Sequence, residues 1–301
     1  MRILVTGGCG FIGSEFVNYV YENHKDYQIV VVDKLTYASD KHSIPHDVRL
    51  IEKDICDVTI SDTGHFDYLV NFAAESHVDN SIKDGTPFVK TNVQGTFNLL
   101  ELSKKTIDFK KFVQISTDEV YGDLDIIGKY SSSESDRCIP SSYYSATKAG
   151  ADELVMAATH TFGIPSLITR TCNNFGSHQH KEKFLPTIME SIKNDKPIPV
   201  YGDGKQIREW IWVRDNVKVI FNLMVSEIGI WNIGSGDTWK NIDIVNEISK
   251  ILNKKVEFEY VKDRLGHDRI YTLDSEKLRM KYLKTKFITK QLKEYLKEQL
   301  L

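Results

Sequence analysis

The segment STDEVYGD (residues 116–123) carries two neighbouring carboxylates, Asp118 and Glu119, directly behind the apolar run KFVQI. Such a run predicts a buried strand, and the end of a strand is where an open α/β sheet offers its ligand crevice. Two adjacent carboxyls in a closed site can have their pKa values driven apart, so that one acts as acid and the other as base. The alternative interpretation is a solvated polar turn.

Tyr144 and Lys148, in the segment YSATK, form a second pair with possible chemistry. On a helix, residues four positions apart share one face. A lysine ammonium beside a phenol favours the phenolate, so we expect the pKa of Tyr144 to be lowered. A phenolate is a base for an alcohol that loses hydride, and Thr117 ends the strand predicted at 111–117, ahead of this segment. The alternative is a surface pair without function.

A glycine-rich turn, TGGCGFIG (6–13), follows the first predicted strand and carries Gly7, Gly10 and Gly13. Glycines there permit a tight turn and let backbone N–H groups approach a pyrophosphate at a helix N-terminus. The next predicted strand ends in Asp33, whose carboxylate can accept both ribose hydroxyls and would repel a 2′-phosphate. The pattern predicts a dinucleotide site and favours NAD over NADP; the alternative is a plain strand-to-helix turn.

Two further strand ends belong to the same expected site. Asp54 and Ile55 follow the third predicted strand, where an adenine could rest, although a loop acid is an equally good interpretation of Asp54. The segment NFAAES (71–76) ends the fourth predicted strand with small residues. Small side chains would let a cofactor lie close to the backbone.

Composition narrows the class of protein. The 301 residues are 41% hydrophobic and 27% charged, which is ordinary for a globular enzyme, and the formal net charge is −3. That charge gives no reason to expect nucleic-acid or membrane binding. The four cysteines are scattered and show no metal-type pair, so we expect reduced thiols, no metal and a cytoplasmic protein. No signal peptide and no membrane span of about 20 apolar residues is expected.

Strand-like and helical patterns alternate through the first two-thirds of the chain, which predicts a doubly wound parallel α/β sheet of the Rossmann type. We expect an NAD-binding domain from residues 1–172 plus about 208–235, and a smaller α+β domain for the substrate from about 173–207 plus 236–301. The strands are predicted at 2–6, 28–33, 48–54, 68–74, 111–117, 165–171, 207–215 and 230–234. Helices are predicted at 14–24, 87–105, 143–162 and 184–194, with a basic amphipathic helix in the tail, 281–300.

With these motifs in place, the chain resembles the extended short-chain dehydrogenases/reductases. Within them it is most similar to nucleoside-diphosphate-glucose 4,6-dehydratases of the dTDP-glucose type. The similarity covers almost the full chain. It is carried by VVDKLTYAS (31–39), NFAAESHVDNSI (71–82), STDEVYGD (116–123), YSATKAGAD (144–152), CNNFG (172–176), EKFLPTIM (182–189), VYGDGKQIREW (200–210) and RLGHDRIYTLD (264–274).

The resemblance implies an internal redox elimination. Tyr144 removes the O4 proton while hydride passes from C4 to NAD⁺, and the 4-keto group then acidifies C5. Glu119 takes the C5 proton, Asp118 protonates the departing C6 hydroxyl, and hydride returns to C6. The catalytic set implied for this chain is therefore Thr117, Asp118, Glu119, Tyr144 and Lys148.

The resemblance also implies a set of ligand-binding residues. Those expected around NAD are Gly7, Gly10, Phe11, Ile12, Gly13, Asp33, Lys34, Leu35, Thr36, Asp54, Ile55, Phe72, Ala73, Ala74, Ser76, Thr91, Tyr144, Lys148 and Asn174. Those expected around the nucleoside-diphosphate-hexose are Ser76, Thr117, Asn173, Arg208, Asn241, Arg264 and His267. By the same analogy the helices at 87–105 and 143–162 are expected to form a homodimer interface.

Some positions depart from the family pattern. Tyr143 stands where a Pro usually precedes the catalytic Tyr, and His180-Lys181 replaces an aromatic-Pro pair. These departures leave open whether the nucleotide is that of thymidine or uridine, and which hexose is used. The alternatives that remain are a UDP-glucose 4,6-dehydratase, a sugar-nucleotide 4-epimerase or decarboxylase on the same fold, and a non-catalytic NAD-binding protein.

Overall fold

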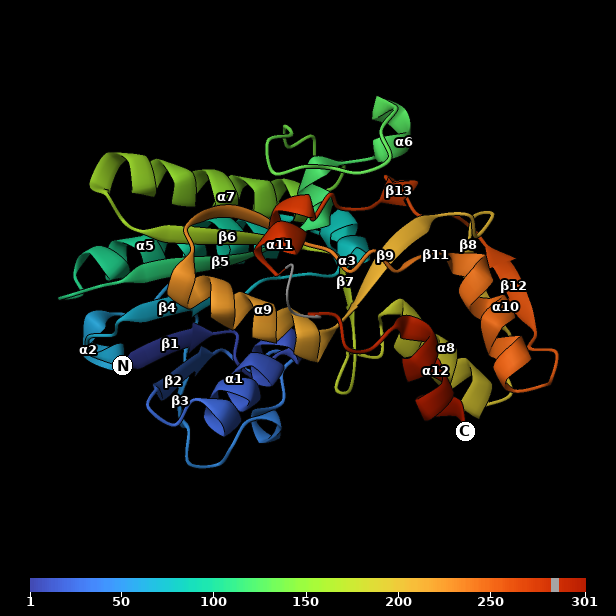
Figure 1. Ribbon diagram of the computed structural model, residues 1–301, viewed down its shortest axis with the longest axis horizontal. Helices are drawn as coiled ribbons and strands as arrows, with labels where there is room; N and C mark the ends of the chain where they lie inside the picture. The colour runs from blue at the N-terminus through green and yellow to red at the C-terminus, as the bar shows by residue number, and fades with distance from the viewer. Residues whose placement is uncertain (283–286) are drawn as a thin grey trace.

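Seven parallel strands form the central sheet of the computed structural model, which describes residues 1–282 and 287–301 (Figure 1). The spatial order is β3-β2-β1-β4-β5-β6-β10, so the chain winds outward in both directions from the junction of β1 and β4. The strands are β1 (Arg2–Thr6), β2 (Gln28–Asp33), β3 (Arg49–Glu52), β4 (Tyr68–Asn71), β5 (Lys111–Thr117), β6 (Ser166–Thr171) and β10 (Gly229–Ile233). This confirms the predicted Rossmann-type sheet.

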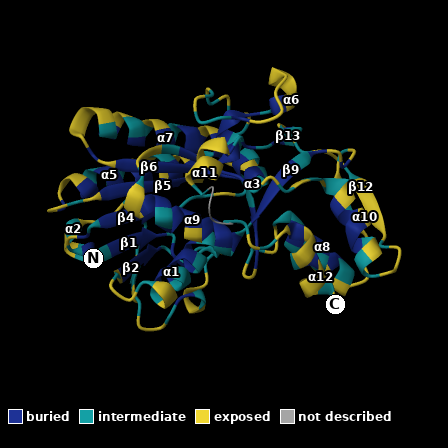
Figure 2. Cartoon of the chain, in the orientation of Figure 1, coloured by how far each residue is buried: buried dark blue, intermediate teal, exposed yellow. Residues whose placement is uncertain are grey.

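Both faces of the sheet are covered because its inner strands are apolar on both sides. Alternate side chains of a strand point to opposite faces, and Ile3 and Val5 pack with α1 (Phe11–Asn23) and α9 (Val213–Ser226). The intervening Leu4 packs with α5 (Thr96–Lys104) and α7 (Tyr143–Phe162) on the other face. The inner strands are accordingly mostly dark in Figure 2, which colours the chain by burial.

Shorter elements complete this part of the chain. They are the helices α2 (Ile60–Thr63), α3 (Val78–Lys83), α4 (Thr86–Phe88) and α6 (Leu124–Ile127), the 3₁₀ turns η1 (Lys41–Ser43) and η3 (Asp118–Tyr121), and the π-helical segment η2 (Val89–Gly95). The predicted helix at 87–105 therefore consists of α4, η2 and α5 in succession.

A second group of elements lies beside the carboxyl ends of the sheet strands (Figure 1). Its own core includes Phe175, Ile188, Trp210, Ile244 and Leu296. β9 pairs with β7, β11 and β13, while β12 pairs with β8. The elements are β7 (Asn173–Phe175), α8 (Phe184–Lys193), β8 (Ile198–Tyr201), β9 (Ile207–Trp212), β11 (Thr238–Lys240), α10 (Asn241–Ile251), β12 (Phe258–Val261), β13 (Ile270–Tyr271) and α12 (Leu292–Leu300).

The predicted division into two domains stays a prediction. One segment of the predicted smaller domain nevertheless packs elsewhere: α11 (Glu276–Lys281) lies against β10, and Leu278 belongs to the core beneath α1 and α9. We therefore propose that the segment around α11 belongs with the larger domain.

The tail and several strand ends differ from the sequence-based expectation: β3 ends at Glu52 and β4 at Asn71, short of the predicted 48–54 and 68–74. α11 ends at Lys281, α12 begins only at Leu292, and residues 283–286 of the predicted tail helix lie outside the described residues. The backbone N–H groups of Thr289 and Lys290 bond to Asp215 of α9, so these residues do not form a helical turn. The predicted strand 207–215 ends at Trp212, because α9 begins at the next residue.

In the part of the chain that the structure describes, no helix combines the length and apolar character that a membrane crossing requires.

The packing of α1 on α9 generates a pH prediction. The ring of His24, which follows α1, stacks on Phe221 of α9 with centroids 3.9 Å apart. Burial lowers the pKa of His24 below its usual 6.5. The unfolded chain therefore binds the additional proton first as the pH falls, and this group withdraws stability on acidification.

We expect wild type to lose more free energy of unfolding between pH 7.5 and 5.5 than His24→Phe, which cannot be protonated. Urea unfolding at the two pH values measures the difference. Equal losses in the two proteins would show that His24 is not held neutral by this packing.

Candidate active site

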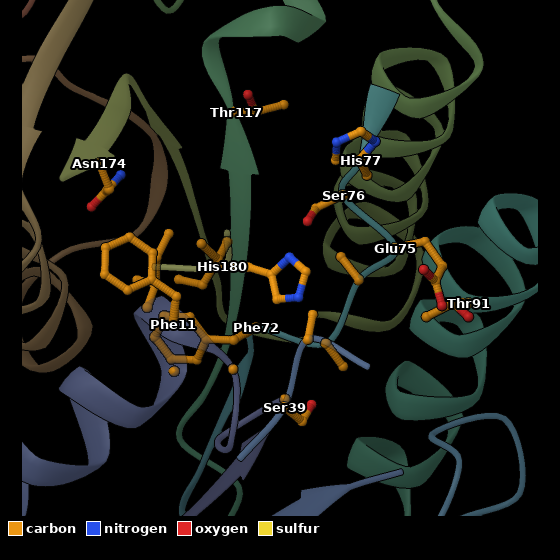
Figure 3. A pocket seen from close by; sticks show the side chains of 18 of the residues that line it. Phe11, Ser39, Phe72, Glu75, Ser76, His77, Thr91, Thr117, Asn174 and His180 are labelled. Atoms are coloured by element: carbon orange, nitrogen blue, oxygen red, sulfur yellow. The ribbon is translucent and has the colours of Figure 1, made fainter. Parts of the chain in front are cut away.

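A pocket opens at the carboxyl ends of β1, β4 and β5, between the sheet and the second group of elements. In Figure 3 it extends from Ser39 to Thr117, with His180 between them. Predicted site residues that line it are Gly7, Gly10, Phe11, Ile12, Gly13, Asp33, Lys34, Thr36, Ile55, Phe72, Ala73, Ala74, Ser76, Thr91, Thr117, Asp118, Glu119, Tyr144, Lys148, Asn173 and Asn174. Six others are not among the lining residues: Leu35, Asp54, Arg208, Asn241, Arg264 and His267.

The glycine turn forms a cradle at the N-terminus of α1. Gly7 has φ +68°, and a Cβ there would lie 2.5 Å from the backbone nitrogen of Ala73. A Cβ at Gly13 would overlap the carbonyl oxygen of Gly7. Gly10 precedes the first helical turn, and no side chain caps the helix. Free N–H groups at a helix start, surrounded by space that only glycine leaves open, suit a diphosphate.

Asp33 stands at the end of β2 and is buried. Its Oδ2 accepts a hydrogen bond from the backbone N–H of Cys9 at 3.0 Å. Its Oδ1 accepts from the N–H of Leu35 at 2.8 Å and from Ser39 Oγ at 3.0 Å. The carboxylate thus ties the glycine turn to the loop after β2 while it lines the pocket.

Lys34, the residue after Asp33, also lines the pocket. Its Nζ lies 3.2 Å from Thr91 Oγ1, 3.4 Å from a carboxylate oxygen of Glu75 and 4.0 Å from one of Asp54. Asp54 also accepts from the N–H of Cys56 at 3.0 Å, and this geometry turns it away from the pocket lining while Ile55 remains in it.

The acidic pair sits on η3, the 3₁₀ turn that follows β5. Thr117 Oγ1 accepts from the N–H of Glu119 at 3.3 Å and donates to Asp118 Oδ1 at 3.2 Å. Asp118 is buried, and its Oδ2 has no hydrogen-bond partner among the described residues. Asp118 thus lines the pocket while one of its buried carboxyl oxygens is left unsatisfied by the described residues.

Burial raises the pKa of Asp118 well above its usual value, and the neighbouring Glu119 raises it further. Burial raises the pKa of Glu119 as well, but three cations oppose that rise: Arg264, Arg208 and Lys183. These cations act on Glu119 more than on Asp118, so the two carboxyls differ in their tendency to ionise, and Asp118 favours the neutral form more strongly.

Tyr144 and Lys148 lie on the buried face of α7. Lys148 Nζ donates to the carbonyl oxygen of Ile115 at 2.6 Å. The expected lowering of the pKa of Tyr144 is not found. Burial and the nearby Glu119 raise it, against a hydrogen bond with Thr117 that lowers it. Desolvation of the phenolate outweighs the lysine here, since the ammonium is directed at a backbone carbonyl.

The predicted diphosphate residues are only partly directed at the pocket. Arg208 is buried, stacks on Tyr271 at 4.3 Å, and donates to the backbone carbonyls of Ile207 and Asp268, each at 2.8 Å. His267 Nδ1 lies 2.6 Å from Asp263 Oδ1, and burial lowers the pKa of His267 to about 4.

Arg264 and Asn241 remain close to this group. The Nε of Arg264 is buried without a partner among the described residues. Asn241 begins α10, and its N–H donates to the carbonyl oxygen of Gln206 at 3.1 Å.

Sequence reasoning missed several lining residues, including Tyr37, Glu75, His77, His180, Glu182 and Lys183. Lys183 is the most informative, because its Nζ donates to the carbonyl oxygen of Ser76 at 2.9 Å and so joins α8 to the loop after β4. Its signal was available, since it lies within the segment EKFLPTIM. His180 had no comparable signal; its ring contacts Tyr37 edge-on at 5.3 Å.

No group of three or more His, Cys, Asp or Glu side chains that could hold a metal ion occurs within residues 1–282 and 287–301.

Comparison with known proteins gives concordant results. Residues 3–234 match the model of the NAD dependent epimerase/dehydratase family. The low-salt glycan biosynthesis protein Agl12 of Haloferax volcanii is 45% identical over 92% of this chain and 91% of its own. The dTDP-glucose 4,6-dehydratase of Haemophilus influenzae is 38% identical over the same shares of the two chains.

Among solved structures, the chain is similar to DesIV, a dTDP-glucose 4,6-dehydratase from Streptomyces venezuelae, crystallised with NAD and dTDP bound. The TM-score is 0.92 at 35% identity, and the match covers 100% of this chain and 96% of the other.

The glycine cradle yields a paired prediction on two helical glycines. Gly13→Ala should lower the free energy of unfolding by about 1–3 kcal/mol, because the new Cβ overlaps backbone that cannot move away. Gly150→Ala on α7 meets nothing closer than Val93 Cγ2 at 3.7 Å and should raise stability by about 0.5–1 kcal/mol. Thermal and urea unfolding measure both. A Gly13→Ala protein as stable as wild type would mean that the turn does not need the close approach.

Proposed function

The chain belongs to the NAD-dependent epimerase/dehydratase family, and on that basis we propose that it dehydrates a nucleoside-diphosphate-glucose to the 4-keto-6-deoxy sugar, with dTDP-glucose as the substrate. The observation that carries the proposal is the buried Asp118, which neighbours Glu119 and whose Oδ2 has no hydrogen-bond partner among the described residues. Oxidation and re-reduction at C4 alone would need no such acid and base. Loss of water from C5 and C6 needs both.

NAD is the cofactor of this family, and the pocket fits it. The cradle of Gly7, Gly10 and Gly13 would hold the diphosphate, and Asp33 the adenosine ribose. When bound, NAD⁺ supplies the acceptor that takes hydride from C4 and returns it to C6.

In the proposed reaction Tyr144 accepts the O4 proton of the sugar. Glu119 then removes the proton at C5, which the 4-keto group has acidified. Asp118 gives its proton to the departing C6 hydroxyl, which leaves as water, and a proton is restored to C5 when hydride arrives at C6. Each positioned proton transfer typically contributes about 10²–10⁴ to the rate.

The opposed environments of the two acids support this division of roles. Asp118 needs to be protonated at the start of the elimination, and burial beside a second carboxylate favours that form. Glu119 needs to be ionised, and the cations of Arg264, Arg208 and Lys183 favour that form. Tyr144 needs help to ionise, and Lys148 supplies a cationic side chain on the same helix face.

The same three cations support a nucleoside diphosphate as the substrate. A diphosphate carries about two negative charges, and Arg and Lys are the usual partners of phosphate oxygens. Ser76 and Asn173 line the same pocket as the two acids and Lys183, and we propose that they contact the sugar and the diphosphate. Asn241 and His267 would lie farther along the same ligand.

The expected homodimer stays a prediction. The segments expected to form its interface, η2 with α5 and α7, pack against each other and leave apolar side chains exposed, among them Val89, Phe97 and Phe162.

The first test of the proposal is to incubate purified protein with NAD⁺ and either dTDP-glucose or UDP-glucose, and to follow the sugar nucleotide by mass spectrometry and NMR. We expect loss of one water from dTDP-glucose, without accumulation of reduced cofactor. Faster dehydration of UDP-glucose would reassign the base. An unchanged mass with inverted C4 would make the protein an epimerase and refute the dehydratase proposal.

Asp118→Asn separates the two leading activities. We expect it to lower kcat for dehydration by about 10²–10⁴, because an amide cannot give a proton to the leaving hydroxyl. An epimerase needs Tyr144 and Lys148 but not this acid, so an Asp118→Asn protein with wild-type turnover would contradict the proposed role. Asp123→Asn is the control, since Asp123 lies outside the pocket lining.

A further inference from the structure

A second buried carboxylate, Asp152, lies behind the catalytic pair and does not line the pocket. It follows Lys148 by one turn of α7. Its Oδ2 accepts hydrogen bonds from Ser116 Oγ at 2.9 Å and from Arg170 Nε at 3.1 Å. Its Oδ1 has no hydrogen-bond partner among the described residues. A carboxylate with no exposed surface and one unmatched oxygen is a costly feature of a core.

Lys148 is the group that this carboxylate can influence most. Lys148 is buried, and its Nζ hydrogen bond to Ile115 ends on a neutral carbonyl, which does not balance the charge. Burial lowers the pKa of Lys148 to about 8, and Asp152 is the charged group that opposes this lowering. A lysine in such a position would lose its proton within the working range of most enzymes if the carboxylate were absent.

Arg170 connects Asp152 to the acidic turn. This buried side chain of β6 pairs with Asp152, and its guanidinium lies 4.8 Å from the ring centroid of Tyr121. Tyr121 ends η3, the turn that carries Asp118 and Glu119, and its hydroxyl donates to Asn232 Oδ1 at 2.8 Å. The ion pair between Asp152 and Arg170 therefore contacts both α7, which bears Tyr144, and the turn η3, which bears the two acids.

We propose that Asp152 is a positioning residue for the reaction: together with Arg170 it holds a negative charge behind Lys148, so that Lys148 stays an ammonium beneath Tyr144. This inference rests on the proposed function for its catalytic meaning. The predicted effect of Asp152 on the protonation of Lys148 involves this chain alone and can be measured without turnover.

Several charged or titratable groups surround Asp152 and Arg170. Lys148 and Tyr144 face Asp152 from its own helix, Arg170 faces it from β6, and Ser116 from β5. Cys138 lies near both Asp152 and Arg170, with Glu153 beyond it, and Glu134 lies near Tyr121. Burial raises the pKa of the Cys138 thiol, so it stays neutral and does not replace the carboxylate.

The direction of the change in the pKa of Lys148 follows from the charge that is removed. Replacing Asp152 by Asn removes the negative charge nearest to Lys148, so the ammonium loses its proton at lower pH. We expect the titration midpoint of Lys148 to fall by about one pH unit or more. The loss of kcat/KM at high pH should move down by a similar amount, because the group that must stay charged is lost earlier.

The direct measurement is NMR of protein labelled with ¹³C at the lysine ε carbon, in which Lys148→Met assigns the resonance of Lys148. Its titration is followed in wild type and in Asp152→Asn. Because Asp152→Asn leaves the buried Arg170 unpaired and could fail to fold, the double variant Asp152→Asn/Arg170→Gln is measured as well. The double variant removes both charges, and the midpoint of Lys148 is expected to fall there too.

Two controls separate charge from general damage. Arg170→Lys keeps the ion pair and should leave the midpoint of Lys148 near that of wild type. Val155→Ala opens a cavity in the same helix away from the pocket and should lower stability without moving the midpoint.

An unchanged midpoint in both Asp152 variants would overturn the proposal and make Asp152 a structural residue. If wild type dehydrates no sugar nucleotide, the proposed function fails, while the NMR midpoint still decides the role of Asp152.

Discussion

Burial of ionisable side chains at the carboxyl end of β5 is the constraint on which the rest of the site depends. Asp118, Lys148, Asp152 and Tyr144 are all largely removed from water there. A buried side chain stays charged there only if an opposite charge or a hydrogen bond stabilises it, and otherwise its neutral form is favoured. The chemistry proposed for this protein uses both results: a carboxyl that stays protonated, and a neighbouring carboxylate and an ammonium that stay charged because fixed groups oppose their neutralisation.

Two parts of the fold create this environment. They are the parallel sheet and the second group of elements, which meet at the carboxyl ends of the sheet strands. The parallel sheet, covered on both faces, brings the glycine cradle after β1 and the acids after β5 to one edge. α7 crosses behind β5, so that Lys148 reaches the carbonyl of Ile115. The second group of elements then brings Lys183 and Arg264 toward Glu119. Those cations favour the ionised form of Glu119 against burial, and so they add to the difference between the two acids.

Much of this arrangement could be predicted from the sequence. Continuous apolar runs identified the sheet strands, and the predicted helix at 143–162 coincides with α7, because periodicity reports directly on burial. Other features depend on contacts between distant segments and left no local pattern. The raised pKa of Tyr144 follows from burial near Glu119, and the break in the tail follows from hydrogen bonds to Asp215. Arg208 bonds backbone carbonyls of its own region, which no local pattern indicated, and its expected contact with phosphate stays a prediction.

The central claim is that hydride moves within one sugar while water is lost between C5 and C6. The most direct test uses dTDP-glucose labelled with deuterium at C4, with the product analysed by NMR and mass spectrometry. The account predicts a 4-keto-6-deoxy product with the deuterium at C6, and in D₂O a solvent-derived deuteron at C5. Deuterium found again at C4 of a product that has kept its C6 hydroxyl would contradict the claim, because hydride would then have returned to the carbon it left.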